Sequence, residues 1–158
     1  MKRIPAIVSV AALSVATGAA QQIEITRNGA RGTIRGPEQA YTGAAIANVL
    51  FSATADSALT AVEVTFEPGA RTAWHNHPAG QYLVVTSGVG WVQQRGGKKR
   101  EIRPGDVVWT PPGVVHWHGA VPTRAMSHLA IWEFVDGSGG DLMEHVSDED
   151  YLAPAATE

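Results

Sequence analysis

The chain has 158 residues, of which 44% are hydrophobic and 17% are charged, and its formal net charge is −3. This length suits one domain with a single buried core, and the composition is that of an ordinary globular protein. The largest basic cluster is Lys98-Lys99-Arg100, too few cations for phosphate binding, so we expect no nucleic-acid partner. The absence of cysteine excludes a disulfide framework and thiolate ligands.

Residues 1–20 have the pattern of a secretory signal. Lys2 and Arg3 form a positive start, residues 4–16 form a short apolar core, and small residues at 18–20 precede the expected cleavage point. The apolar core is too short to span a bilayer as a permanent helix. We therefore predict export, with the periplasm as the destination, and no membrane partner after cleavage. The alternative is a buried N-terminal strand.

The mature chain divides into three parts by composition. Residues 21–45 are polar and rich in glycine and arginine, and we interpret them as an N-terminal arm that includes an alternating Ile23-Glu24-Ile25 piece. Such an arm either forms an edge strand or pairs with a second subunit. Residues 46–136 contain the apolar runs of the predicted domain. Residues 137–158 form a C-terminal extension, with a flexible break at 137–140 and a predicted acidic helix within 141–151.

The domain of residues 46–136 shows the pattern of strands. Residues 43–51 are small and apolar, and fit a strand or a short turn of helix. Leu59–Phe66 alternates clearly, with Val62, Val64 and Phe66 on one face, and the last strong strand covers residues 126–134. Regular turn signals separate the runs: Glu67-Pro68-Gly69, Ser87-Gly88, Gly96-Gly97-Lys98, Arg103-Pro104-Gly105-Asp106 and Pro111-Pro112-Gly113. Many short strands at this spacing predict an all-β sandwich or barrel.

Two stretches carry metal-ligating side chains. His75, His77 and Gln81 have the spacing H-x-H-x₃-Q, and alternation along an extended strand puts both imidazoles on one side. The break at residues 78–80 turns the chain, so that the Gln81 amide reaches the same point. His116 supplies a third imidazole after a Pro-Gly turn. Three nitrogens and one oxygen suit a divalent first-row transition metal. The alternative is that His75 and His77 are surface histidines of a strand.

These stretches resemble the two motifs of the cupin superfamily. The first motif, G-x₅-H-x-H-x₃,₄-E-x₆-G, is filled from Gly69 to Gly88, with Gln81 in place of the glutamate. The second motif, G-x₅-P-x-G-x₂-H-x₃-N, is filled from Gly105 to His116, and Ala120 stands where asparagine is usual. The resemblance implies a single-domain, jelly-roll-like cupin β-barrel, here with a short N-terminal arm and a short C-terminal helix.

The alternation of side chains along the strands predicts two further imidazoles near the metal site that are not assigned as ligands. His118 lies two residues after His116 and therefore points to the same face, and His128 shares a face with Ala130 and Trp132. A non-ligand imidazole near a metal is a candidate general base. The alternative for His128 is a core histidine satisfied by a backbone carbonyl, and for His118 a residue that only supports a ligand or faces the surface.

Nearly the whole mature chain, from Ile23 to Tyr151, resembles small bacterial cupins that include the manganese-dependent (R)-hydroxynitrile lyases. The matching segments are VTFEPGARTAWHNHPAGQ (64–81), GDVVW (105–109), HWHGA (116–120), AMSHLAI (125–131) and MEHVSDEDY (143–151). The resemblance implies a set of site residues: His75, His77, Gln81 and His116 as metal ligands, His128 as catalytic base, and Thr72 and His118 as pocket lining. The reaction implied is cleavage of a cyanohydrin to an aldehyde and HCN, with the metal holding the hydroxyl oxygen.

The function we expect is therefore that of a metal-dependent lyase on a small-molecule substrate. Manganese is the expected metal, with iron, zinc, nickel and cobalt as alternatives. The neutral Gln81 leaves the full charge of the ion uncompensated, which favours Lewis-acid chemistry over oxygen activation. Trp132 stands where those lyases carry a polar residue, so the pocket differs. Alternative functions are an iron-dependent dioxygenase, a decarboxylase or isomerase, or a non-catalytic metal-binding cupin. We expect a homodimer or homotetramer.

Overall fold

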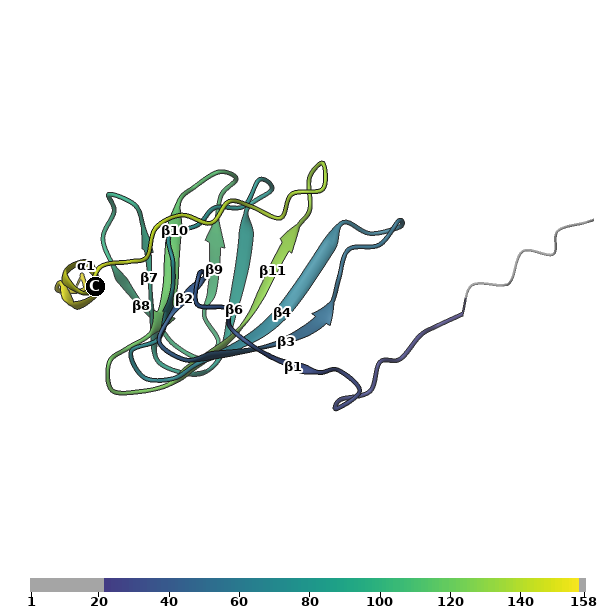
Figure 1. The fold of residues 1–158 in the computed structure, drawn as a ribbon, viewed down its shortest axis with the longest axis horizontal. Helices are drawn as coiled ribbons and strands as arrows, with labels where there is room; N and C mark the ends of the chain where they lie inside the picture. Colours follow the sequence, from purple (N-terminus) through teal and green to yellow (C-terminus); the bar gives the residue numbers. More distant parts are fainter. Residues whose placement is uncertain (1–21, 157–158) are drawn as a thin grey trace, which may run out of the picture.

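The fold is built almost entirely of antiparallel strands. The structure, a computed structural model, describes residues 22–156, so the signal predicted for residues 1–20 lies outside the described residues. The elements are β1 (Thr33–Arg35), β2 (Tyr41–Thr42), β3 (Ala45–Phe51), β4 (Leu59–Phe66), β5 (Arg71–Thr72), β6 (Gln81–Gly88), β7 (Gly90–Gln94), β8 (Arg100–Ile102), β9 (Val107–Thr110), β10 (His116–Ala120), β11 (Met126–Glu133) and α1 (Asp148–Leu152). The predicted all-β class with a short C-terminal helix is confirmed (Figure 1).

Two sheets form the barrel. One has six strands in the order β1-β3-β4-β11-β6-β9, and the other has five in the order β2-β5-β10-β7-β8. The strand predicted over Leu59–Phe66 is β4, and the ambiguous segment 43–51 forms the strand β3. No helix in the described part of the chain has the length and apolar character needed to span a membrane.

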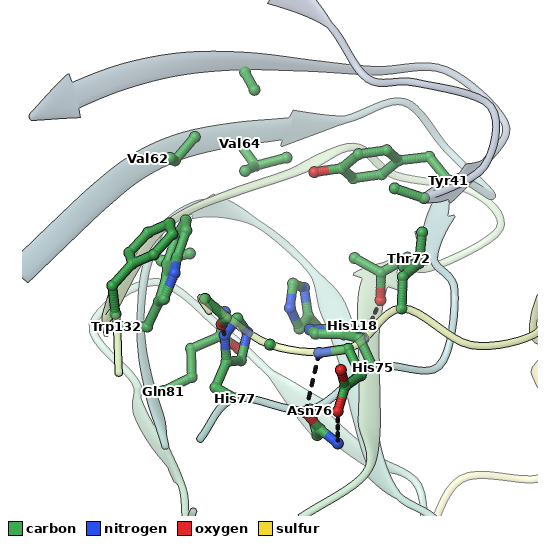
Figure 2. A pocket seen from close by; sticks show the side chains of 18 of the residues that line it. Tyr41, Val62, Val64, Thr72, His75, Asn76, His77, Gln81, His118 and Trp132 are labelled. Atoms are coloured by element: carbon green, nitrogen blue, oxygen red, sulfur yellow. Dashed lines mark hydrogen bonds between the residues drawn. The ribbon is translucent and has the colours of Figure 1, made fainter. Parts of the chain in front are cut away.

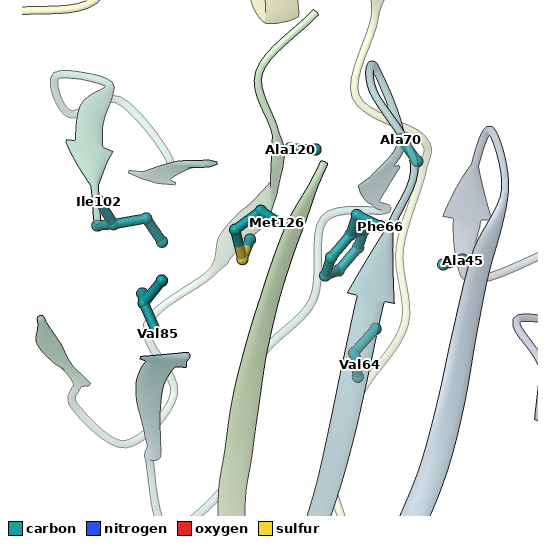
Figure 3. Packing of buried hydrophobic residues seen from close by; sticks show 8 residues of the cluster. All are labelled: Ala45, Val64, Phe66, Ala70, Val85, Ile102, Ala120 and Met126. Atoms are coloured by element: carbon teal, nitrogen blue, oxygen red, sulfur yellow. The ribbon is translucent and has the colours of Figure 1, made fainter. Parts of the chain in front are cut away.

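The hydrophobic core fills one end of the space between the sheets. Phe66 and Met126, both 0% exposed, lie opposite each other on β4 and β11 (Figure 3). Burying side chains of this size stabilises the fold by roughly 1.5–3 kcal/mol each. Further along the same two strands Val62 lies opposite Ala130, and both line a cavity. The inward-facing residues of β4 and β11 therefore form a packed core at one end of the barrel and line a cavity at the other.

The C-terminal segment returns across the five-stranded sheet, as the yellow chain shows in Figure 1. The helix is shorter than predicted, because residues 141–144 are extended and hydrogen-bond to the backbone of Trp74 and Asn76. Tyr151 of α1 is buried and donates its hydroxyl hydrogen bond to the Ala120 carbonyl at 2.7 Å. The Arg71 guanidinium stacks on the Tyr151 ring at 4.3 Å from its centroid. This docking holds the extension against the barrel.

Candidate metal centre

Three imidazoles meet inside the barrel. His116 and His118 belong to β10, and His75 follows β5, which pairs with β10. The backbone N–H groups of His75 and His116 each donate to the other residue's carbonyl, at 3.0 and 2.9 Å. This register brings ring nitrogens of His75, His116 and His118 to within 4.8 Å of one another. The described residues thus contain a cluster of ligand atoms close enough to share one ion.

The other two predicted ligands lie beside this cluster. The His77 ring centroid is 5.3 Å from that of His75 and 5.9 Å from that of His116. Gln81, the first residue of β6, places its Oε1 atom 2.9 Å from Nε2 of His116. Figure 2 shows His75, His77 and Gln81 on one wall of a cavity, with His118 beside them. All four side chains predicted as ligands therefore lie together.

Hydrogen bonds to the backbone fix the tautomers of three of these imidazoles. Their Nδ1 atoms lie 2.9, 2.6 and 3.0 Å from backbone carbonyl oxygens, and the pairs are His75 with Ala73, His77 with Gly139, and His116 with Val114. A carbonyl only accepts, so each Nδ1 carries the proton and each Nε2 offers a lone pair. Nε2 of His77 is buried without a partner.

The contact between His116 and Gln81 also fits a bound cation. In the tautomer that Nδ1 fixes, Nε2 of His116 is an acceptor, and Oε1 of Gln81 is an acceptor as well. A 180° rotation of the Gln81 amide would let its nitrogen donate here, whereas the orientation in the structure puts two acceptors 2.9 Å apart, an arrangement that a cation next to both would stabilise. Neutral nitrogens with an amide oxygen are ligands that divalent first-row metals accept. The donor set therefore fits the metal that the cupin motifs imply.

His118 and His128 form a second, connected pair. Nε2 of His128 lies 3.0 Å from Nδ1 of His118, and both rings pack against Phe66. Nε2 of His118 has no partner, and His118 lines the cavity. His128 points into the barrel as parity predicted, but it is 0% exposed and lies behind His118, outside the cavity lining. Thr72 lines the cavity and accepts a hydrogen bond from the His118 backbone N–H at 3.2 Å.

The cavity beside the imidazoles has a volume of about 390 Å³. One wall carries His75, His77, Gln81 and His118, and the opposite walls are mostly apolar. The apolar lining includes Ala47, Val49, Val62, Val64, Ala130, Trp132 and Phe134. The Trp132 ring lies 5.4 Å from the His77 ring between centroids. A few convergent polar groups in an apolar cavity are typical of small-molecule sites.

Burial keeps these histidines neutral. Desolvation, with the nearby His116 as the next cause, lowers the pKa of His75 to about 3. Desolvation also lowers the pKa of His116 to about 4 and that of His128 to about 4, and it lowers the pKa of His77 and His118. At neutral pH the imidazoles are therefore unprotonated at one nitrogen, the form that binds metals.

The metal-free protein is expected to lose stability in acid. The pKa of a histidine in the unfolded chain is near 6.5, whereas burial holds the pKa of His75, His116 and His128 at about 3 to 4 in the folded state. Between these values the unfolded state binds more protons, so the free energy of unfolding falls as the pH falls from about 6.5 to about 4. The slope is roughly 1 kcal/mol per pH unit for each histidine. Urea unfolding across this range measures it, and a flat profile would contradict the burial argument.

Sequence reasoning missed the part that the C-terminal extension plays in the site. Gly139 supplies the carbonyl that orients His77, and residues 139–142 line the cavity. A Cβ atom on Gly140 would lie 2.0 Å from the Asn76 carbonyl oxygen, and Gly140 has a φ of +139°. Only glycine fits there. The glycine-rich break read from the sequence is thus the place where the chain passes close to the backbone of Asn76 and His77. The glycines were the one signal of this approach in the sequence.

Two antiparallel sheets around a histidine-lined cavity define a β-barrel with a candidate metal centre. The cupin domain model matches residues 62–132. The chain is 54% identical over 129 residues to an (R)-mandelonitrile lyase from Granulicella tundricola, which covers 82% of this chain and 98% of that protein. The chain belongs to the cupin family.

Solved structures agree with this assignment. A cupin-like protein from Thermotoga maritima superposes with a TM-score of 0.72 at 38% identity, over 82% of this chain and 95% of that one. The polyketide cyclase RemF from Streptomyces resistomycificus superposes with a TM-score of 0.65 at 17% identity, over 82% and 91% of the two chains. At that identity the cyclase shows the shared fold alone.

Proposed function

We propose that this protein is a metal-dependent lyase that cleaves cyanohydrins to an aldehyde and HCN and catalyses the reverse reaction. The 54% identity to a mandelonitrile lyase over 98% of that protein supports a lyase activity. The observation that carries the proposal is the set of three carbonyl-anchored imidazoles beside a largely apolar cavity. In this arrangement, a metal held by the imidazoles would bind the hydroxyl oxygen of the substrate, and the adjacent cavity would accommodate its apolar substituent.

We assign the ligands as His75, His77, Gln81 and His116, and the metal as manganese. The fixed tautomers of the histidines and the position of the Gln81 oxygen support the set. When bound, the ion supplies a Lewis acid for the substrate oxygen, and the neutral Gln81 leaves its charge uncompensated. A ring nitrogen of His118 also lies in the cluster. We do not assign His118 as a ligand, because its Nδ1 contacts His128, whereas the Nδ1 atoms of the three assigned histidines contact backbone carbonyls.

The His118–His128 pair provides the base. In cleavage, the hydroxyl proton of the substrate passes to Nε2 of His118, which is buried beside the cavity without a partner. The electron pair of the O–H bond becomes the carbonyl π bond. The bond between the two carbons breaks, and cyanide leaves with its pair and takes up the proton as HCN. His128 contacts Nδ1 of His118 and holds that ring in place.

The apolar walls select the rest of the substrate. Val62, Val64 and Trp132 present carbon surface to the cavity, so an aryl or alkyl group gains free energy by leaving water there. The same walls lower the polarity of the surroundings of the developing charge, which strengthens electrostatic stabilisation. We therefore propose aromatic or bulky aliphatic cyanohydrins as the substrate class.

We also propose that the mature protein acts in the periplasm as a homodimer or homotetramer. The charged start and apolar core of residues 1–20 support export. Exposed apolar residues on the six-stranded sheet support association: Tyr82 is 47%, Trp109 46% and Val107 63% exposed. Burial of such a surface against a second copy would also cover strand edges.

The lyase proposal predicts cyanide release that needs a metal but no oxygen. Metal-loaded protein should release cyanide from racemic mandelonitrile at the same rate under air and under nitrogen, because no step transfers electrons to an oxidant. Chelation should stop release, and Mn²⁺ should restore it, with Fe²⁺, Zn²⁺, Ni²⁺ and Co²⁺ tested in parallel. Free Mn²⁺ is the control. A requirement for O₂ and iron would favour the dioxygenase alternative.

A further inference from the structure

One hydroxyl group of the cavity has no part in the proposed reaction so far. Tyr41 belongs to β2, which joins the five-stranded sheet with Tyr41 opposite Thr72 of β5. Its ring lies 5.9 Å from that of Phe66, between centroids. On another side, a Cβ atom on Gly36 would lie 2.7 Å from the ring, so the glycine leaves the space that the ring fills. The ring is therefore held in one place on the cavity wall.

The Tyr41 hydroxyl is free to bind a ligand. Figure 2 shows its oxygen directed into the cavity. Among residues 22–156, the structure gives this hydroxyl no hydrogen-bond partner. Desolvation raises the pKa of Tyr41, so the group keeps its proton and remains a donor. A ligand acceptor in the cavity would give this hydroxyl a hydrogen bond, and such a bond contributes about 1 kcal/mol.

Neighbouring polar groups on the cavity wall are already engaged. Oγ1 of Thr72 accepts from the backbone of His118 at 3.2 Å. The Asn76 side chain pairs with Asp141, through its amide nitrogen at 3.3 Å and its oxygen at 3.1 Å. Unlike these two side chains, the Tyr41 hydroxyl makes no hydrogen bond with the described part of the chain.

The cavity has three chemically different sides. The metal-ligating side chains His77 and Gln81 form one, the Trp132 indole forms a second, and Tyr41 lies across the cavity from Trp132 (Figure 2). The reacting carbon of an aldehyde cyanohydrin carries three groups besides hydrogen: a hydroxyl oxygen, an apolar substituent and a nitrile. The hydroxyl oxygen would bind on the side of the metal-ligating side chains. The apolar substituent would pack against the Trp132 indole. The nitrile, which accepts hydrogen bonds, would then lie on the third side, where the Tyr41 hydroxyl is a donor.

We propose that Tyr41 binds the cyano group, donating its hydroxyl hydrogen bond to the nitrile nitrogen of the substrate and to the departing cyanide. This inference rests on the proposed function, because it takes a cyanohydrin as the ligand. A donor fixed at the position where negative charge develops stabilises the transition state. Contact at three different sides also holds one enantiomer in the reactive orientation, so Tyr41 determines stereoselectivity as well.

Tyr41→Phe tests this inference because it removes one oxygen atom and keeps the ring. We expect kcat/KM for mandelonitrile to fall about tenfold to a hundredfold, with a lower enantiomeric excess of the remaining substrate. Binding of benzaldehyde, which has no cyano group, should not change. Tyr82→Phe is the matched control, because Tyr82 is 47% exposed on β6 and does not line the cavity. It should match the wild type in every assay.

A binding measurement separates this inference from the lyase proposal. Thiocyanate is a linear anion with a terminal nitrile-like nitrogen, and its affinity for the metal-loaded protein can be measured by calorimetry without turnover. We expect Tyr41→Phe to weaken it about tenfold. Equal affinity in the variant, or no binding to the wild type, would overturn the role of Tyr41. Tyr41-dependent binding in a wild type that releases no cyanide would keep the anion site and reject the lyase reaction.

Discussion

Replacing His116 with alanine is expected to abolish metal binding and cyanide release together. His116 is 1% exposed, its Nδ1 is anchored to the Val114 carbonyl, and its Nε2 faces the oxygen of Gln81. Removal of a supporting hydrogen bond around a metal ligand costs about 10–100-fold in affinity, and loss of the ligand itself should cost more. We expect the metal content after dialysis to fall from stoichiometric to near zero, with activity at the level of free Mn²⁺.

The matched control for this variant is His145→Ala. His145 is an exposed histidine whose ring contacts Thr42 outside the cavity. It should retain full metal content, as measured by elemental analysis, and full activity. Circular dichroism of His116→Ala checks that the barrel persists. A folded His116→Ala protein that kept stoichiometric metal would show that the ligand set is wrong and that His118 takes the vacant position.

Replacing His128 with alanine should separate the two properties, with metal retained and turnover lost. His128 contacts Nδ1 of His118 and is absent from the cavity lining, so its removal leaves the ligand nitrogens in place. Without it, His118 loses the contact that fixes its ring for proton transfer. Loss of a positioned base lowers rates by about 10²–10⁴-fold. The measurement is kcat for cyanide release at equal metal content.

Two further observations distinguish positioning from simple damage to the fold. His128→Gln keeps a polar group near His118 and should recover part of the activity, whereas His128→Ala should not. The pH profile of kcat/KM should also change in His128→Ala, because the proton acceptor changes its surroundings. Wild-type kcat and an unchanged pH profile in His128→Ala would remove this residue from the reaction.

The fold could be predicted from the sequence because strands have a period of two. Alternation along Leu59–Phe66 gave the bounds of β4 and the inward face of Val64 and Phe66. The same parity placed His116 and His118 on one face of β10. The assignment of the metal ligands stays a prediction, although the side chains that it names lie together in the structure.

Other features depend on contacts that a local pattern does not contain. Alternation along a strand predicts which face a side chain is on, but not how deeply it is buried. It therefore could not predict that His128 lies behind His118. The Gly139 carbonyl reaches His77 across 62 positions of sequence, and no periodicity reports such a contact. Tyr41 lies in the segment interpreted as an arm, and its place in the cavity follows from the pairing of β2 with β5.

The measurement that tests the central claim most directly is cyanide release from racemic mandelonitrile during titration of the metal-free protein with Mn²⁺ under nitrogen. The account predicts that activity rises in proportion to bound metal, ends at one ion per chain, and consumes one enantiomer selectively. A protein with one ion bound per chain that released no cyanide would contradict the account.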